Sequence, residues 1–189
     1  NTTEADIDSY QFTLYADYDL SDDAYIQGSA AYAYNSIDQE RHDVGFAGNT
    51  ADADYNANQF TVQAEAGRDF SVSRVFNLTP KGLVHYMYYQ AEDYIETGAG
   101  GVGLHVENDS LQVFEIGAGL DARWSFKQSD GTELAPFLSA GYRYDLIGDA
   151  VASTSVFTGG GAAFSTQAAD PAPGTVNVGA GVKYTMEKL

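Results

Sequence analysis

The chain has 189 residues, of which 9 are basic and 27 are acidic, and its formal net charge is −18 at pH 7. This acidic excess argues against nucleic-acid binding, which needs a basic surface, and against docking on anionic lipid through basic clusters. The chain has no cysteine, so disulfides and thiolate metal sites are excluded. Its length is sufficient for one domain with a sizeable core.

Composition alone leaves a membrane location open. No apolar run approaches the roughly 20 residues of a membrane helix. The mean hydropathy of −0.28 fits a soluble protein, but it fits a transmembrane barrel equally well, because half of each barrel strand faces water. The first residues, Asn1–Glu4, show no signal peptide. We therefore expect that a signal peptide was removed or that the chain is an internal piece of a longer one.

Alternation of apolar and polar residues predicts seven antiparallel strands. Successive side chains of a strand point to opposite faces, so a long alternating run marks one apolar and one polar face. The predicted strands are 9–20, 24–35, 55–70, 78–90, 111–126, 134–146 and 175–185.

The run 111–126 shows this pattern most clearly. From Phe114 onward its even positions are apolar and end in Trp124 and Phe126, whereas its odd positions carry Glu115, Asp121 and Arg123. The length of the run and its aromatic end fit a strand that crosses a bilayer with its polar face toward a lumen.

Short turns alternate with long stretches along the chain. The short turns are 21–23, 71–74 and 127–131, and the long stretches are 36–54, 91–110 and 147–174. We interpret 36–54 as an exposed acidic loop without chemistry, and we allow a small flap at 104–107 and a short strand at 155–157. Short turns at one end and long loops at the other are typical of bacterial outer-membrane barrels.

Strand length separates a membrane barrel from a soluble sandwich. Sandwich strands can also alternate, with their apolar faces meeting in one core, but they typically have about 5–6 residues. Membrane strands need about 9–11, and Tyr near the strand ends fits two interfacial girdles. Arg68 is the clear exception to an uncharged even face. We predict an all-β, antiparallel up-and-down transmembrane β-barrel that forms a single domain over residues 1–189.

The charged odd positions are the candidate functional residues. Ionisable groups inside a membrane domain usually pair with one another or face water. We predict a lumen-facing polar network that solvates the lumen and neutralises itself, or that lines a path or holds a plug segment. Its members are Glu65, Lys81, His85, Glu115, Asp121, Arg123, Arg143, Asp145 and Lys183.

No catalytic, cofactor or metal site is predicted. His42 and His105 fall in predicted loops and His85 on the polar face of a strand, and no pair has metal-ligand spacing. A G-x-S-x-G elbow is missing, and the glycine-rich run 98–103 lacks the Lys-Ser/Thr of a phosphate loop. We therefore expect no enzyme activity.

Several short motifs follow one another in a characteristic order. They are Leu78–Pro80 to Tyr86, Gly98–Gly100, the Gly-Ala-Gly-Leu120 strand, Leu134–Phe137 to Tyr144, and Gly179–Tyr184. This order resembles the C-terminal translocator domain of type V autotransporters over most of the chain from Tyr10 onward. The resemblance implies a twelve-stranded barrel in the bacterial outer membrane, with a helix through its lumen, that anchors and helps to export an N-terminal passenger. It implies three partners: outer-membrane lipid, the barrel assembly machinery and the protein's own passenger segment.

The chain departs from the family pattern in two ways. Its seven strands best match strands four to ten, and it ends in Glu187–Leu189 instead of a strand with a terminal aromatic. Hydrocarbon does not tolerate unpaired strand edges, so we expect an incomplete part of a longer barrel. Two alternatives stay open: a small outer-membrane porin or structural barrel, and a soluble extracellular β-sandwich adhesin whose acidic loops bind a partner.

Overall fold

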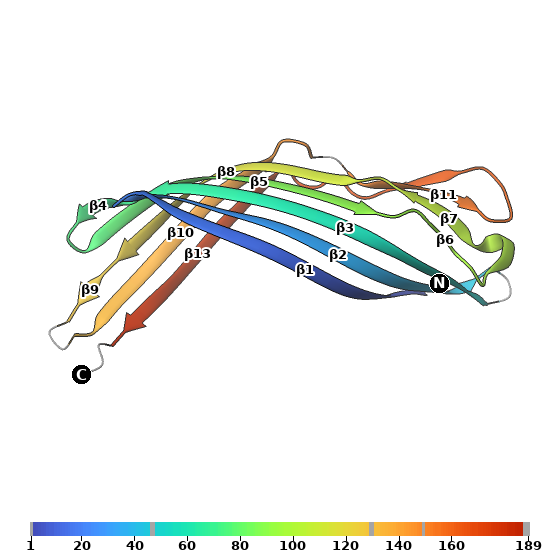
Figure 1. Ribbon diagram of the computed structural model, residues 1–189, viewed down its shortest axis with the longest axis horizontal. Coiled ribbons are helices and arrows are strands. Elements are labelled where there is room, and N and C mark those ends of the chain that lie inside the picture. The colour runs from blue at the N-terminus through green and yellow to red at the C-terminus, as the bar shows by residue number, and fades with distance from the viewer. Residues whose placement is uncertain (1, 46–47, 129–130, 149, 187–189) are drawn as a thin grey trace.

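Seven long strands pair side by side in the computed structural model, which describes residues 2–45, 48–128, 131–148 and 150–186. Each strand pairs with its neighbour along the chain, in the order β1-β2-β3-β5-β8-β10-β13. Their bounds are β1 Thr2–Ser21, β2 Ala24–Val44, β3 Asn49–Arg68, β5 Phe76–Ala91, β8 Leu111–Trp124, β10 Glu133–Asp145 and β13 Gly174–Thr185. The sheet curls along this order into a half-barrel (Figure 1). The predicted antiparallel up-and-down fold is confirmed.

The short turns gather at one end of the sheet, where β13 also ends (Figure 1). Two short strands, β4 (Phe70–Ser73) and β9 (Phe126–Lys127), continue the pairing there against β5 and β10. Arg68, the exception on the even face, also lies there, and its Nη2 is 3.0 Å from Asp23 Oδ2 in the first turn. The centre of the turn 127–131 and the terminal Glu187–Leu189 lie outside the described residues.

The opposite end carries a second, smaller sheet (Figure 1). Its strands pair in the order β12-β11-β7-β6. Their bounds are β6 Tyr94–Ile95, β7 Leu104–Asn108, β11 Ala152–Phe157 and β12 Phe164–Gln167, and a 3-10 turn, η1, spans Gly100–Val102. The flap allowed at 104–107 corresponds to β7, and the strand allowed at 155–157 falls within β11. The described residues contain no helix with the length and apolar character of a membrane span.

The interpretation of 36–54 as an irregular loop is wrong. β2 runs on to Val44 and β3 begins at Asn49, and the two strands stay in register from Ser36 opposite Asn56 to Arg41 opposite Ala51. β1 likewise begins at Thr2, well before the predicted start at residue 9. The physical reason is that backbone pairing needs no strongly apolar side chains when small residues alternate with carboxylates.

The buried apolar residues lie mainly at the end of the molecule that carries the smaller sheet. In the described chain they are Ala33, Ile37, Val44, Ala51, Ala53, Ala57, Ala99 and Val106. We define the cap as the described residues of 36–57, 92–108 and 151–168. A backbone bridge between Asp52 and Thr97 joins the first two of these ranges, and the pairing of β7 with β11 joins the third. The cap therefore holds the apolar core, whereas the long sheet lacks one.

The two faces of the long sheet are arranged inversely to those of a soluble protein. Side chains on the concave side of a curled sheet crowd one another, and on β8 and β10 the odd positions are mostly half-buried whereas the even ones are mostly exposed. The even, convex face is apolar: Tyr10 is 72% exposed, Leu14 60% and Val178 80%. An apolar convex face with a polar concave one is what a strand between lipid and water requires.

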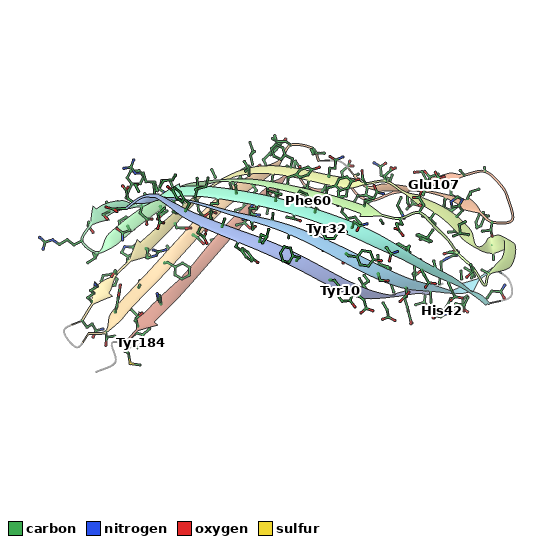
Figure 2. All side chains as sticks on the ribbon, in the orientation of Figure 1. Tyr10, Tyr32, His42, Phe60, Glu107 and Tyr184 are labelled. Atoms are coloured by element: carbon green, nitrogen blue, oxygen red, sulfur yellow. The ribbon has the colours of Figure 1, made fainter. Side chains whose placement is uncertain are left out.

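Aromatic residues mark the edge of the apolar band on the cap side. Tyr10 lies opposite Tyr34, and the Tyr34 hydroxyl donates a hydrogen bond of 2.6 Å to Asn56 Oδ1. Figure 2 shows Tyr10 and Tyr32 along the long strands and Tyr184 toward the opposite end. Beyond this row the even positions become acidic, as in the facing pair Asp6 and Asp38. The change from Tyr to Asp fits a passage from interface to water.

We predict that Leu120→Arg on the convex face of β8 destabilises the protein far more than Gln63→Arg on the concave face of β3. An Arg placed toward hydrocarbon near the bilayer centre costs about 2–4 kcal/mol, whereas an Arg on the wet wall stays hydrated. Urea unfolding in lipid vesicles measures both variants. Equal losses would contradict the assignment of the two faces.

Candidate functional site

The concave wall brings charged side chains from neighbouring strands together. The register sets His85 opposite Glu115, and it sets Lys81 opposite Gly119 with Asp121 two residues further along the same face. Because these positions are all odd, their side chains project from the same face of the sheet. The candidate residues therefore meet across strands, as cross-strand neighbours do.

Lys81 is the centre of one cluster on this wall. Its Nζ lies 3.0 Å from Asp121 Oδ2 and 3.7 Å from Glu65 Oε2. Glu65 Oε1 also accepts hydrogen bonds from the Tyr25 hydroxyl at 3.0 Å and from Gln27 Nε2 at 3.1 Å. One cation thus connects carboxylates on β3 and β8, and neutral donors on β2 complete the shell of Glu65.

Glu115 is the centre of a second cluster, closer to the cap. His85 Nδ1 lies 3.0 Å from Glu115 Oε2, and Arg143 Nη1 lies 3.9 Å from the same oxygen. Asp145 takes a different role: its Oδ1 accepts hydrogen bonds from the backbone N–H groups of Phe114 and Ile147, each at 3.1 Å. Its carboxylate therefore ends β10 and makes no ion pair with a described residue.

The two remaining candidates, Arg123 and Lys183, are exposed on the concave side and make no hydrogen bond or ion pair with any described residue. Both line a hollow of about 640 Å³ at the short-turn end of the wall, together with Lys81, Asp121 and Glu133. The predicted single network is thus two paired clusters, one carboxylate, Asp145, that binds backbone N–H groups, and two cations without partners in the described chain.

The fold and the wall can be compared with known proteins. A family model for the autotransporter β-domain matches residues 1–188. The chain belongs to this family. The solved translocator domain of the autotransporter NalP from Neisseria meningitidis has a similar fold, with a TM-score of 0.57 and 20% identity over 97% of this chain and 68% of that one. YaiT, an uncharacterized protein of Escherichia coli strain K12, is 24% identical over 142 residues, which are 75% of this chain and 14% of YaiT.

The chain is thus an autotransporter β-domain of the outer membrane, and its fold is that of the solved translocator domain. The chain spans 14% of the length of the curated relative that it matches. Among the described residues, no three His, Cys, Asp or Glu side chains are grouped so that they could hold a metal ion.

Glycines shape the wall in a way that sequence reasoning missed. A Cβ on Gly117 would lie 3.1 Å from Arg143 Cγ, and one on Gly119 would lie 3.2 Å from Lys81 Cε. A Cβ on Gly181 would lie only 2.5 Å from the Phe137 ring. Long side chains therefore lie flat against bare backbone, which keeps them out of the lumen. The available signal was glycine at alternate odd positions opposite long side chains.

A buried ion pair fixes the cap, and it too was missed. Glu96 has a side chain only 1% exposed, and its carboxylate accepts two hydrogen bonds from the guanidinium of Arg41, of which Nε–Oε1 is 2.9 Å. The N–H of Leu104 donates a third hydrogen bond of 2.8 Å to Oε2. The hydrogen bond to Glu96 raises the pKa of Arg41 above its ordinary value. Next to this pair, the Tyr55 and Tyr94 rings stack at 4.4 Å.

We predict that Glu96→Gln loosens the cap and leaves the membrane strands folded. Removing one partner of a buried charge pair typically costs about 3–5 kcal/mol, because Arg41 would keep a buried charge without its counterion. Hydrogen exchange of the backbone amides in 36–44 and 92–104 measures the loosening. Glu107→Gln, on the exposed part of β7 near the same end (Figure 2), is the matched control and should leave exchange unchanged.

The acidic hairpin end adds a pH dependence. A hydrogen bond shared with Asp54 raises the pKa of Asp38 above the ordinary Asp value, and the nearby charges of Asp54, Asp8 and Asp6 act in the same direction. A carboxyl with a raised pKa stabilises the folded hairpin most below the ordinary pKa, and this contribution is lost as the pH rises through the raised value.

We therefore expect the end of the β2–β3 hairpin to open more easily as the pH rises above about 4. Hydrogen exchange of residues 37–42, corrected for the intrinsic exchange rate at each pH, measures this opening. Asp38→Asn should flatten the dependence, since it removes the titrating group. A dependence that persists unchanged in this variant would rule out Asp38 as its source.

Proposed function

We propose that the concave wall lines the path along which this domain carries or holds its linked passenger segment, while the convex face anchors the domain in outer-membrane lipid. The inverted arrangement of the two faces carries this proposal. An extended polypeptide exposes backbone N–H and C=O groups that hydrocarbon cannot satisfy. A wall of half-buried charges and amides, wetted by water, can accommodate them.

The paired clusters suit a path of this kind. Lys81 and Arg143 each face carboxylates, so that most of the wall charge near them is compensated. A wall whose charges are compensated stays hydrated, and it does not bind a charged passenger segment so tightly that the segment stops moving. The mechanism is therefore physical, and the domain itself contributes no covalent step.

Lipid and the barrel assembly machinery are the partners that this architecture supports. The exposed apolar band of the convex face needs hydrocarbon around it, because large apolar patches on water-facing surfaces drive association. Every long strand of the meander needs a paired neighbour in hydrocarbon, which favours insertion that is guided by dedicated machinery.

The wall supports transport in preference to catalysis. His85 beside Glu115 resembles an oriented base, but no described hydroxyl or thiol is hydrogen-bonded to its ring to act as a nucleophile. The soluble sandwich alternative requires the apolar faces of the strands to meet in one interior. In the described residues those faces are exposed instead.

The test is a charge reversal within the full-length protein in bacterial outer membranes. We expect Arg143→Glu to lower surface display of the passenger several-fold, because the substitution places a second carboxylate next to Glu115. The barrel itself should still fold. The swapped pair, Glu115→Arg with Arg143→Glu, should restore display toward the wild type. Protease accessibility of the passenger and heat-modifiable migration of the barrel give the two readouts.

Glu107→Lys in the exposed part of the cap is the control for a simple change of charge, and it should display normally. A folded Arg143→Glu barrel with undiminished display would show that the wall charges play no part in export.

A further inference from the structure

The hollow at the short-turn end of the wall is electrostatically unbalanced. It holds the cations Lys81, Arg123 and Lys183 and the carboxylates Asp121 and Glu133. Three cations thus stand against two carboxylates. Asp121 is paired with Lys81 and Glu133 is hydrogen-bonded to a neutral hydroxyl, whereas Arg123 and Lys183 have no partner among the described residues. The hollow thus presents positive charge that the wall itself does not neutralise.

The contacts show how the carboxylates are engaged. Asp121 Oδ2 lies 3.0 Å from Lys81 Nζ, and Glu133 Oε1 accepts a hydrogen bond of 2.5 Å from the Ser125 hydroxyl. Lys81 Nζ also lies 3.7 Å from Glu65 Oε2. Arg123 and Lys183 are therefore the groups left to meet a ligand.

The geometry of the strands keeps these two cations accessible. Arg123 on β8 lies opposite Phe137 on β10, and Lys183 on β13 lies opposite Ala135 on the other side of β10. β8 and β13 are thus two strand spacings apart, about 10 Å. The small side chain of Ala135 lines the same hollow and leaves room above it.

The opposite end of the strand order carries the opposite charge. Asp17 and Asp19 lie on the odd face of β1, both are exposed, and neither makes a hydrogen bond or ion pair with a described residue. Asp17 lines a separate hollow of about 260 Å³ with Tyr15, Gln27 and Gln63. The β1 side of the wall is thus anionic, and the β8–β13 side is cationic at its short-turn end.

We infer that the hollow beside Arg123 and Lys183 binds carboxylate side chains of the polypeptide segment in the lumen, and that this contact turns the acidic side of the segment toward β8–β13 and away from β1. The inference rests on the proposed function, since it names the chemistry of the segment that the path holds. Two cations on strands that lie about 10 Å apart suit several carboxylates on one segment, and the carboxylates of β1 repel that same side.

The test places a photo-crosslinking residue in the hollow of the full-length protein. With Ala135→benzoylphenylalanine, irradiation during export should crosslink a passenger segment, and mass spectrometry should find Asp or Glu next to the crosslinked position. Adding Arg123→Glu and Lys183→Glu should lower the yield by at least about tenfold, because losing even one charge-assisted hydrogen bond has an effect of that size. Arg74→Glu, in the exposed turn after β4, is the matched control and should leave the yield unchanged.

A neutral pair, Arg123→Gln with Lys183→Gln, keeps the test decisive if the double reversal fails to fold, and heat-modifiable migration reports folding. Crosslinks that persist at full yield in the folded neutral pair, or that join segments without carboxylates, would overturn the inference and leave the proposed path intact. A second crosslinking residue at Gln63 distinguishes failure of this inference from failure of the proposed path. If no passenger segment crosslinks at position 135 or at position 63, the proposed path itself is wrong.

Discussion

The need to satisfy every backbone hydrogen-bonding group without help from water is the constraint on which this structure depends. In hydrocarbon an unpaired N–H or C=O costs several kcal/mol, and the long strands meet this demand by continuous pairing in one meander. Once the backbone is paired, the side chains are free to divide into an apolar convex face and a charged concave face. The stability of the sheet therefore comes from its ladder of backbone hydrogen bonds, and the apolar core lies elsewhere, in the cap.

The membrane part of the fold could be predicted from the sequence because its information is local. Alternation along one strand, as in 111–126, assigns each residue to a face without knowledge of its neighbours. It placed the seven strands, and it put the residues of both wall clusters on the same face. It did not show that Arg123 and Lys183 lack partners in the described chain, because pairing depends on register and side-chain reach.

Apart from the short strands at 104–107 and 155–157, the cap could not be predicted, for two physical reasons. Its buried positions in β3 are alanines, such as Ala51 and Ala53, whose alternation with carboxylates reads as an acidic loop. Its central contact joins Arg41 to Glu96, 55 residues apart in the chain. The sequence around each of these two residues contains no pattern that predicts a contact with the other. Their contact is therefore seen only in the folded structure.

The length of the β2–β3 hairpin has a consequence for geometry outside the lipid. From the aromatic row at Tyr34 to the end of β2 at Val44 the strand climbs about 25 Å along the barrel axis, given the usual rise and tilt of barrel strands. The barrel wall on the cap side thus extends above the lipid headgroups. On the proposed path, a passenger segment enters bulk water at a height set by rigid backbone, clear of the membrane surface.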